Sequence, residues 1–310
     1  MKKRQLGKTN IELSELGYGC AALFGKNVIG KHGLSEEGSL QIIKTAIEFG
    51  VNFFDTGFNY GYAEERLGRC LTSVFKDVGM SRRDIVIETK CGEILNADGT
   101  YGSYNWSPDW IKKSVEISLK RLNTDYIDLL AMHGGNPEDC SDELLHVFQD
   151  LKSQGIIHAY GVNSFDKRFL EWIFEEKCFD YVMLDYNILQ QDREVIIQRL
   201  DETGIGVIAG MALGQSLFSK KKIKNRNDLW YFLRAFAHFR ENMIKGRDFQ
   251  FLTKQDGYSG NQLALRYVLD NSHIASAVFS TISIDHLLDD LSAADILMPE
   301  NIRRQIKDRA

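Results

Sequence analysis

Short apolar segments alternate with longer amphipathic segments along almost the whole chain, and this alternation restricts the possible folds more than any other feature. Most of the apolar segments are apolar on both faces, and several are rich in Val, Ile or aromatic residues. This pattern is typical of parallel strands that are buried on both sides. The predicted strands cover residues 16–20, 51–55, 85–89, 126–132, 156–162, 181–184, 207–209 and 276–279.

The segments between these strands carry apolar residues at helical spacing. Apolar positions at 40–47 and 111–122 each fall on one helix face, and Ser107 followed by Pro108 is a helix-start signal. Eight strand-then-helix units in series fit either an open doubly wound sheet or a closed barrel. The count and the 310 residues favour a (β/α)₈ barrel of the TIM type. Later helices are expected at about 141–153, 166–176, 193–202, 260–270 and 284–294.

Two additions to this barrel are expected. Residues 4–13 contain Gly7-Lys8-Thr9-Asn10 between two short apolar runs and predict an N-terminal β-hairpin. Residues 212–258 form a long insert between the seventh strand and its helix, with aromatic residues clustered between Trp230 and Phe239. An insert of that length is usually functional or mobile. No domain boundary is evident, so residues 1–310 are interpreted as one domain.

Charge and cysteine content exclude several function classes. The formal net charge of −5 gives no electrostatic reason to expect nucleic acid or an anionic membrane as a partner. The five cysteines include no C-x-x-C pair, which argues against a disulfide framework or a zinc site. No apolar stretch approaches the ~18 residues of a membrane span, and no signal peptide is recognisable. The sequence therefore predicts a cytoplasmic location and gives no indication of oligomeric state.

Polar residues end three consecutive predicted strands. Asp55 ends the second strand, with Tyr60 in the loop that follows, Lys90 ends the third and His133 ends the fourth. Taken singly, each is more often a surface, capping or structural residue than a catalytic one. In a barrel of this type, however, the reacting groups sit at the carboxyl ends of the strands. We therefore expect the four side chains to meet at one barrel mouth.

This combination suits reduction of a carbonyl group. Hydride transfer to a carbonyl carbon leaves negative charge on oxygen, so a proton donor is needed nearby. The pKa of a free tyrosine is near ~10, and a neighbouring ammonium lowers it. We expect Tyr60 to be the donor, Lys90 to tune it, Asp55 to hold Lys90, and His133 to orient the substrate oxygen.

Several motifs resemble the aldo-keto reductase family over nearly the whole chain. They are Asn-Phe-Phe-Asp-Thr at 52–56 with Tyr-Gly at 60–61, Thr-Lys at 89–90, Leu-Lys-Arg-Leu at 119–122 with Asp-Tyr-Ile-Asp at 125–128, and Ala-Leu-Arg at 264–266. The family's catalytic Asp, Tyr, Lys and His fall on Asp55, Tyr60, Lys90 and His133. The resemblance implies NADP(H) or NAD(H) bound without a Rossmann fold. The glycines at 204, 206 and 210 do not form a dinucleotide fingerprint, because they run through a predicted strand that is not followed directly by a helix.

The cofactor positions that the resemblance implies depart from the family pattern. Asn163 and Ser164 stand in swapped order, Met183 replaces a glutamine, and Gly210 replaces an aromatic residue. The family's habit favours NADP(H). Neither lysine nor arginine occurs between residues 280 and 290 to bind its 2′-phosphate, so NAD(H) is expected to compete; the basic run at 220–226 is the alternative phosphate-binding segment. The remaining implied cofactor positions are Leu213, Gly214, Ser280, Thr281, Ser283 and His286.

Aromatic residues give the only indication of substrate. Phe58, Trp106 and Trp230 are expected near the barrel mouth, where they suit a carbonyl compound with a ring, such as a sugar or a small aromatic aldehyde. Thr-Lys-Cys-Gly at 89–92 and Gly-Tyr-Gly-Cys-Ala at 17–21 resemble the sugar-dehydrogenase branch of the family. The main alternative is a cofactor-binding regulatory barrel that resembles potassium-channel β-subunits. A metal-dependent lyase is disfavoured because no His/Glu ligand set is recognisable, and no metal is expected.

Overall fold

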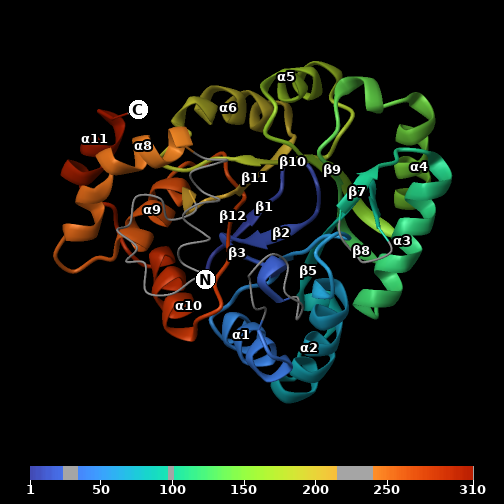
Figure 1. Cartoon of the computed structure of the whole chain (residues 1–310), viewed down its shortest axis with the longest axis horizontal. Helices are drawn as coiled ribbons and strands as arrows, with labels where there is room; N and C mark the ends of the chain where they lie inside the picture. Colours follow the sequence, from blue (N-terminus) through green and yellow to red (C-terminus); the bar gives the residue numbers. More distant parts are fainter. Residues whose placement is uncertain (24–33, 97–100, 215–239, 310) are drawn as a thin grey trace.

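Eight parallel strands close into a barrel with helices packed around it (Figure 1). The structure is a computed structural model that describes residues 1–23, 34–96, 101–214 and 240–309. Around the barrel the order is β10-β11-β12-β3-β4-β5-β8-β9, so strands that follow one another in sequence are neighbours. The barrel strands are β3 Leu16–Gly19, β4 Phe53–Asp55, β5 Val86–Cys91, β8 Ile127–His133, β9 Ile157–Asn163, β10 Tyr181–Asp185, β11 Gly206–Gly210 and β12 Ser276–Phe279.

The helices follow the strands and begin at residues that can cap them. Ser107 accepts a hydrogen bond from the backbone N–H of Trp110, and Pro108 occupies the first helical position, as the sequence predicts. The described helices are α1 Glu36–Glu48, α2 Ala63–Val78, α3 Pro108–Leu122, α4 Asp142–Ser153, α5 Lys167–Glu176, α6 Glu194–Thr203, α8 Arg240–Asp248, α9 Gly260–Leu269, α10 Ile284–Leu291 and α11 Glu300–Lys307.

Two apolar layers hold the barrel together. The larger layer lies between the strands and the surrounding helices. The smaller one fills the barrel interior with alternate residues of the strands, since successive side chains of a strand point to opposite faces. It includes Phe53, Leu129, Tyr181, Met183 and Ile208.

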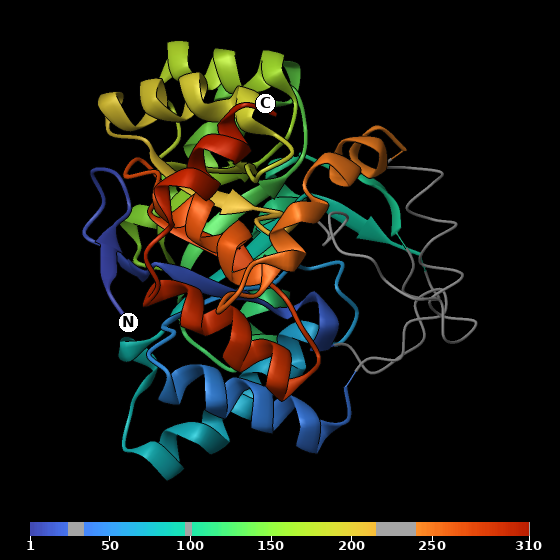
Figure 2. The same ribbon diagram turned by 90° about the vertical axis from the view of Figure 1, so that its left-hand side faces the viewer.

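A β-hairpin covers the end of the barrel at which the strands begin. It consists of β1 Lys3–Gln5 and β2 Glu12–Ser14, paired antiparallel. Leu6 and Leu13 from this hairpin belong to the interior layer. Gly7 has a φ of +53°, and a Cβ there would lie 2.4 Å from the backbone nitrogen of Gly206, so only glycine fits. Figure 2 shows the hairpin and the β6–β7 ribbon at opposite ends of the barrel.

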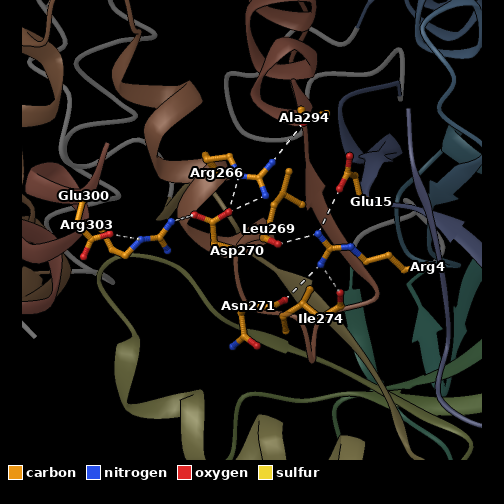
Figure 3. A network of polar contacts seen from close by, with 10 residues as sticks. All are labelled: Arg4, Glu15, Arg266, Leu269, Asp270, Asn271, Ile274, Ala294, Glu300 and Arg303. Atoms are coloured by element: carbon orange, nitrogen blue, oxygen red, sulfur yellow. Dashed lines mark hydrogen bonds and ion pairs between the residues drawn. The ribbon is translucent and has the colours of Figure 1, made fainter. Parts of the chain in front are cut away.

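Arg4 links this hairpin by hydrogen bonds to the end of α9 and the loop that follows it (Figure 3). Its guanidinium donates hydrogen bonds to the carbonyl oxygens of Leu269 at 2.7 Å, Ile274 at 2.9 Å and Asn271 at 3.3 Å. It also pairs with the buried Glu15 at 3.2 Å. The hairpin is therefore held by charge-assisted bonds as well as by apolar contacts.

A second antiparallel ribbon stands at the other end of the barrel. It is formed by β6 Glu93–Leu95 and β7 Tyr101–Tyr104 and follows directly after β5. Gly92 has a φ of +105°, and a Cβ there would lie 2.0 Å from the indole of Trp106. Trp106 in turn stacks on Tyr104, with ring centroids 5.2 Å apart. The ribbon is thus packed tightly onto the end of β5.

The predicted barrel, its eight strands and the N-terminal hairpin are confirmed. Predicted helix bounds agree within one or two residues, except that α10 stops at Leu291 and residues 292–294 form a 3₁₀ turn. The eight predicted strand-then-helix units include α2, for which the sequence gave no bounds, whereas α11 and the β6–β7 ribbon were not predicted. Of the predicted insert at 212–258, the structure describes α8 and a 3₁₀ turn at Gln250–Lys254, and the aromatic cluster lies outside the described residues.

Candidate active site

Asp55, Lys90 and His133 lie on three neighbouring strands at the carboxyl end of the barrel. Asp55 is the last residue of β4, Lys90 is the penultimate residue of β5, and His133 is the last residue of β8. Tyr60 follows β4 in a tight turn in which its backbone N–H donates to the carbonyl of Gly57 at 3.0 Å. The structure therefore brings the four predicted residues to one mouth.

Lys90 and Asp55 form a buried ion pair. The Lys90 ammonium also donates to the backbone carbonyl of Thr56 at 2.7 Å, and its side chain is 1% exposed. Burial by itself lowers the pKa of Lys90, but Asp55, Tyr60 and Glu88 raise it by more, so the net pKa is above its ordinary value. Lys90 is therefore a fixed positive charge beneath the mouth.

Tyr60 is close to this charge and to the imidazole of His133. The Lys90 Nζ is 5.2 Å from the centre of the Tyr60 ring, and the His133 ring meets it edge-on with centroids 5.8 Å apart. Burial raises the pKa of Tyr60 to about 12, and Lys90 opposes part of that rise. The sequence predicts that the Lys90 ammonium lowers the pKa of Tyr60. In the structure burial has the larger effect, and the phenol stays protonated at neutral pH.

Glu64 fixes the loop that carries Tyr60. Its buried carboxylate accepts a hydrogen bond from Thr89 at 2.6 Å and pairs with Arg121 at 2.9 Å. Arg121 also donates to the carbonyl oxygen of Phe58 at 3.2 Å. These contacts join α2, β5 and α3 to the loop and limit its movement. They also give a structural role to Arg121 of the motif at 119–122.

Glu88 is a buried carboxyl that the sequence analysis missed. It accepts a hydrogen bond from the Tyr181 hydroxyl at 3.0 Å and lies beside Asp55 in the β4–β5 register. Burial raises the pKa of Glu88 to about 8, against the opposing effect of Lys90 and with a further contribution from Asp55. Two carboxyl groups thus flank one ammonium, and one proton is retained between them. The sequence could have indicated Glu88, because a residue two positions before Lys90 on a strand faces the same side of the sheet.

Glu93 is the second carboxylate that the sequence analysis missed. It is the first residue of β6 and is wholly buried. Its Oε1 forms an ion pair with Nδ1 of His133. No residue pattern in the sequence indicated this pairing, because it depends on the unpredicted turn at Gly92.

The predicted cofactor residues occupy the strands that continue around the barrel from His133. Asn163 ends β9 and lies beside His133 in the strand register, and the buried Ser164 follows it. Within the described part of the chain, the Asn163 side chain makes no hydrogen bond. An amide and a hydroxyl next to the mouth fit the carboxamide of a nicotinamide ring.

Met183 and Gly210 pack against each other at the next two strands. Met183 on β10 is 3% exposed, and a Cβ on Gly210 would lie 3.4 Å from its sulfur. The thioether therefore occupies the space beside Gly210. Neither residue supplies the hydrogen bond or the aromatic face that the family pattern has there.

The other predicted cofactor residues follow β11 and β12. Leu213 is half-buried and Gly214 is buried with a φ of +49°, in the turn after β11. Ser283 caps α10 by accepting from the backbone N–H of His286 at 3.4 Å. The Tyr18 hydroxyl holds this segment through a 2.7 Å hydrogen bond to the carbonyl of Thr281. Ser280 and His286 are exposed.

The three predicted substrate residues have different placements. Trp106 is half-buried and packs over Gly92 and Gly135, beside the mouth. The Phe58 ring is 4% exposed and lies against Trp110, with centroids 5.9 Å apart, so it supports the loop and presents little surface to a substrate. Trp230 and the basic run at 220–226 lie outside the described residues.

Two further features are absent from the part of the chain that the structure describes. No cluster of three or more His, Cys, Asp or Glu side chains there has the arrangement of a metal site. None of the described helices has the length and apolar character needed to cross a membrane.

The chain is similar in sequence to known proteins over most of its length. The family model described as "Aldo/keto reductase family" matches residues 15–308. The chain is 29% identical to an uncharacterized oxidoreductase, YqkF, of Bacillus subtilis, over 95% of this chain and 92% of that protein. It is 28% identical to the NADH-specific methylglyoxal reductase of Escherichia coli, over 96% and 94%. It is 25% identical to the L-galactose dehydrogenase of Arabidopsis thaliana, over 94% and 87%.

A solved structure has the same fold over nearly its whole length. The holo form of aldo-keto reductase AKR11C1 from Bacillus halodurans superposes with a TM-score of 0.79 at 26% identity, covering 100% of this chain and 96% of that one.

Proposed function

The chain belongs to the aldo/keto reductase family and is an oxidoreductase, and we propose that it interconverts a carbonyl compound and an alcohol with Tyr60 as the general acid. The observation that carries this proposal is the proximity of the Tyr60 ring to both the Lys90 ammonium and the His133 imidazole. A protonated phenol at that point is suited to donate to an oxygen that becomes negative.

A nicotinamide cofactor, when bound, would supply the hydride. Asn163 and Ser164 would hold its carboxamide, and the residues at the start of α10 would face its adenosine end. Asn163 is next to His133 in the strand register, which supports a nicotinamide position beside the reacting carbonyl.

Each of the four residues has a distinct task in this proposal. Tyr60 gives its proton to the carbonyl oxygen during reduction and takes it back during alcohol oxidation. The Lys90 ammonium stabilises the phenolate that remains after reduction, and Asp55 keeps Lys90 in place through the ion pair. His133 hydrogen-bonds the carbonyl oxygen and orients it toward Tyr60.

Both nicotinamide cofactors are proposed to bind. The family's habit favours NADP(H). The start of α10, however, offers Ser280, Thr281, Ser283 and His286 but no lysine or arginine for a 2′-phosphate. The E. coli relative is named as NADH-specific. Dissociation constants for NADPH and NADH are expected to lie within a hundredfold of each other, and a larger preference for NADPH would contradict this proposal.

The proposed substrate class is a small carbonyl compound or sugar. Trp106 and Tyr104 stack beside the mouth and suit contact with the flat or apolar face of a ring. The names of the relatives include a sugar dehydrogenase and a reductase of a small dicarbonyl.

The test is an absorbance assay at 340 nm with aldoses, ketones and aldehydes and with each cofactor. Tyr60→Phe is expected to abolish carbonyl reduction and to leave cofactor binding nearly intact. Tyr62→Phe, two residues along and 41% exposed, is the matched control and is expected to keep turnover. Wild-type turnover in Tyr60→Phe would refute the proposed mechanism.

The same assay tests a regulatory alternative. Met183 and Gly210 give the cofactor site no hydrogen bond or aromatic stack at β10 and β11, as a barrel that binds cofactor mainly for regulation could tolerate. That alternative predicts that no carbonyl compound oxidises bound NADPH at an appreciable rate.

A further inference from the structure

We propose that Glu88 is a positioning residue for carbonyl reduction: its carboxyl must keep its proton so that the Lys90 ammonium can stabilise the Tyr60 phenolate. Loss of that proton slows the reaction, so Glu88 sets a pH limit on turnover that the four residues at the mouth do not set. The catalytic part of this inference rests on the proposed function. The proton on Glu88 is a property of the resting protein and is tested separately.

The first support is the position of Glu88 inside the barrel. Glu88 is wholly buried and lies beside Asp55 in the β4–β5 register. Lys90, two residues further along β5, faces the same side of the strand as Glu88. Two carboxyl groups and one ammonium therefore share the interior beneath the mouth, and both carboxyl groups act on Lys90.

The second support is the hydrogen bonding of the Glu88 carboxyl. Its Oε1 accepts from the hydroxyl of Tyr181 at 3.0 Å, a bond that joins β10 to β5 through the barrel interior. Its Oε2 is buried and receives no hydrogen bond from any described residue. The polar neighbour on β4 is Asp55, an acceptor that is already paired with Lys90. A proton on Glu88 replaces two facing acceptors by a donor and an acceptor.

The charges around Glu88 favour keeping this proton. The titratable groups near it come from four elements: Asp55 of β4, Tyr60 of the following loop, Lys90 of β5 and Tyr181 of β10. Its neighbour on β8, Leu129, is apolar. Burial raises the pKa of Glu88 to about 8 against the opposing effect of Lys90, and Asp55 adds to the rise. At neutral pH, one carboxylate therefore balances one ammonium.

Ionisation of Glu88 acts on Tyr60 through this balance. Reduction of a carbonyl leaves a phenolate on Tyr60, which Lys90 stabilises. When Glu88 is ionised, the ammonium faces two carboxylates before any phenolate forms, and the charge on Glu88 raises the pKa of Tyr60 further. Proton donation to the carbonyl oxygen is then slower. One unit charge acting through a protein interior on a partly formed phenolate changes the rate by about tenfold.

The first test measures the proton on Glu88 in the full-length protein without substrate. The infrared difference between the wild type and Glu88→Gln should contain the carbonyl stretch of a protonated carboxyl at pH 6.5. That band should give way to a carboxylate band with a midpoint near pH 8. Asp290 titrates in both proteins and cancels in the difference. A carboxylate band at pH 6.5 would overturn the inference.

The second test is the pH profile of kcat for reduction of benzaldehyde by saturating NADPH, with circular dichroism to confirm that each protein stays folded. The wild type should lose about tenfold in kcat as the pH rises through about 8. Glu88→Gln cannot ionise at residue 88 and should show no such fall. Glu175→Gln, on the exposed part of α5, is the matched control and should follow the wild type.

Tyr181→Phe gives an independent check that does not need Glu88→Gln to fold. It removes the hydrogen bond that lowers the pKa of Glu88, so the fall in kcat should move up by about one pH unit. A fall that persists in Glu88→Gln, or that stays near pH 8 in Tyr181→Phe, would overturn the inference. A protonated Glu88 in a protein that reduces no carbonyl compound would instead refute the proposed function and leave the proton on Glu88 standing.

Discussion

Replacing Glu88 by glutamine should change how the stability of the barrel depends on pH. The pKa of Glu88 rises from an ordinary value of 4.5 to about 8, chiefly because the carboxyl is buried. The folded protein therefore holds a proton between these pH values that the unfolded chain releases. By linkage, stability must fall as pH rises through that window and level off above it.

The magnitude follows from the shift. Each pH unit in the window costs at most ~1.4 kcal/mol, so Glu88 makes the fold about 3–5 kcal/mol less stable at pH 8 than at pH 5. Glutamine mimics the protonated carboxyl: its oxygen can accept from Tyr181 and its amide can donate toward Asp55. The variant should match the wild type near pH 5 and exceed its stability increasingly toward pH 8.

The assay is urea unfolding followed by circular dichroism at pH 5, 6, 7 and 8. Asp290, with a pKa raised by burial to about 7, contributes a slope of the same sign, but it is common to both proteins and cancels in the difference. Glu175→Gln, on the exposed part of α5, is the control and should track the wild type at every pH. Parallel curves for the wild type and Glu88→Gln would refute the assignment of the retained proton to Glu88.

Three further substitutions test other parts of the site. Lys90→Met should lower the free energy of unfolding by about 3–5 kcal/mol, because it leaves Asp55 buried without a partner. It should also lower turnover by at least 10²-fold, and an unchanged urea midpoint would contradict the ion-pair role. Met183→Gln should tighten cofactor binding about fivefold by adding one hydrogen bond worth ~1 kcal/mol, as fluorescence titration would show; an unchanged Kd would mean that residue 183 does not face the cofactor. Gly92→Ala should cost about 1–3 kcal/mol and shift tryptophan emission, since its Cβ would collide with Trp106; a silent substitution would show that the ribbon is loosely packed.

The parts of the fold that depend on local pattern were predictable from sequence. Strands buried on both faces and helices with capping residues gave the barrel, and barrel topology then gathered Asp55, Lys90 and His133 without further information. The eight strand-then-helix units imply α2, and the helical spacing of Leu67, Cys70, Leu71 and Val74 would also have given its approximate bounds.

The electrostatics of the site could not be predicted in the same way. Burial raises the pKa of Tyr60 and Lys90 lowers it. Which effect is larger depends on how much water the packed loop excludes, and the spacing of residues in the sequence gives no information about that. The Glu93–His133 pair joins residues forty positions apart through a ribbon whose turn depends on a positive φ at Gly92. Neighbouring strands can be predicted from their order, whereas the contacts between particular charged atoms depend on three-dimensional packing.

The hairpin that covers the base of the barrel has a consequence for synthesis. Arg4 is synthesised long before Leu269, because the carbonyl that it binds lies 265 positions later in the chain. At about 5–20 residues per second, the hairpin waits roughly 13 to 53 seconds for its binding site. During that time Leu6 and Leu13 have no interior to fill, so the nascent barrel is open at its base. Closure of the barrel base is thus a late event that joins segments far apart in the sequence, and it leaves a long interval in which a chaperone can act on the exposed leucines.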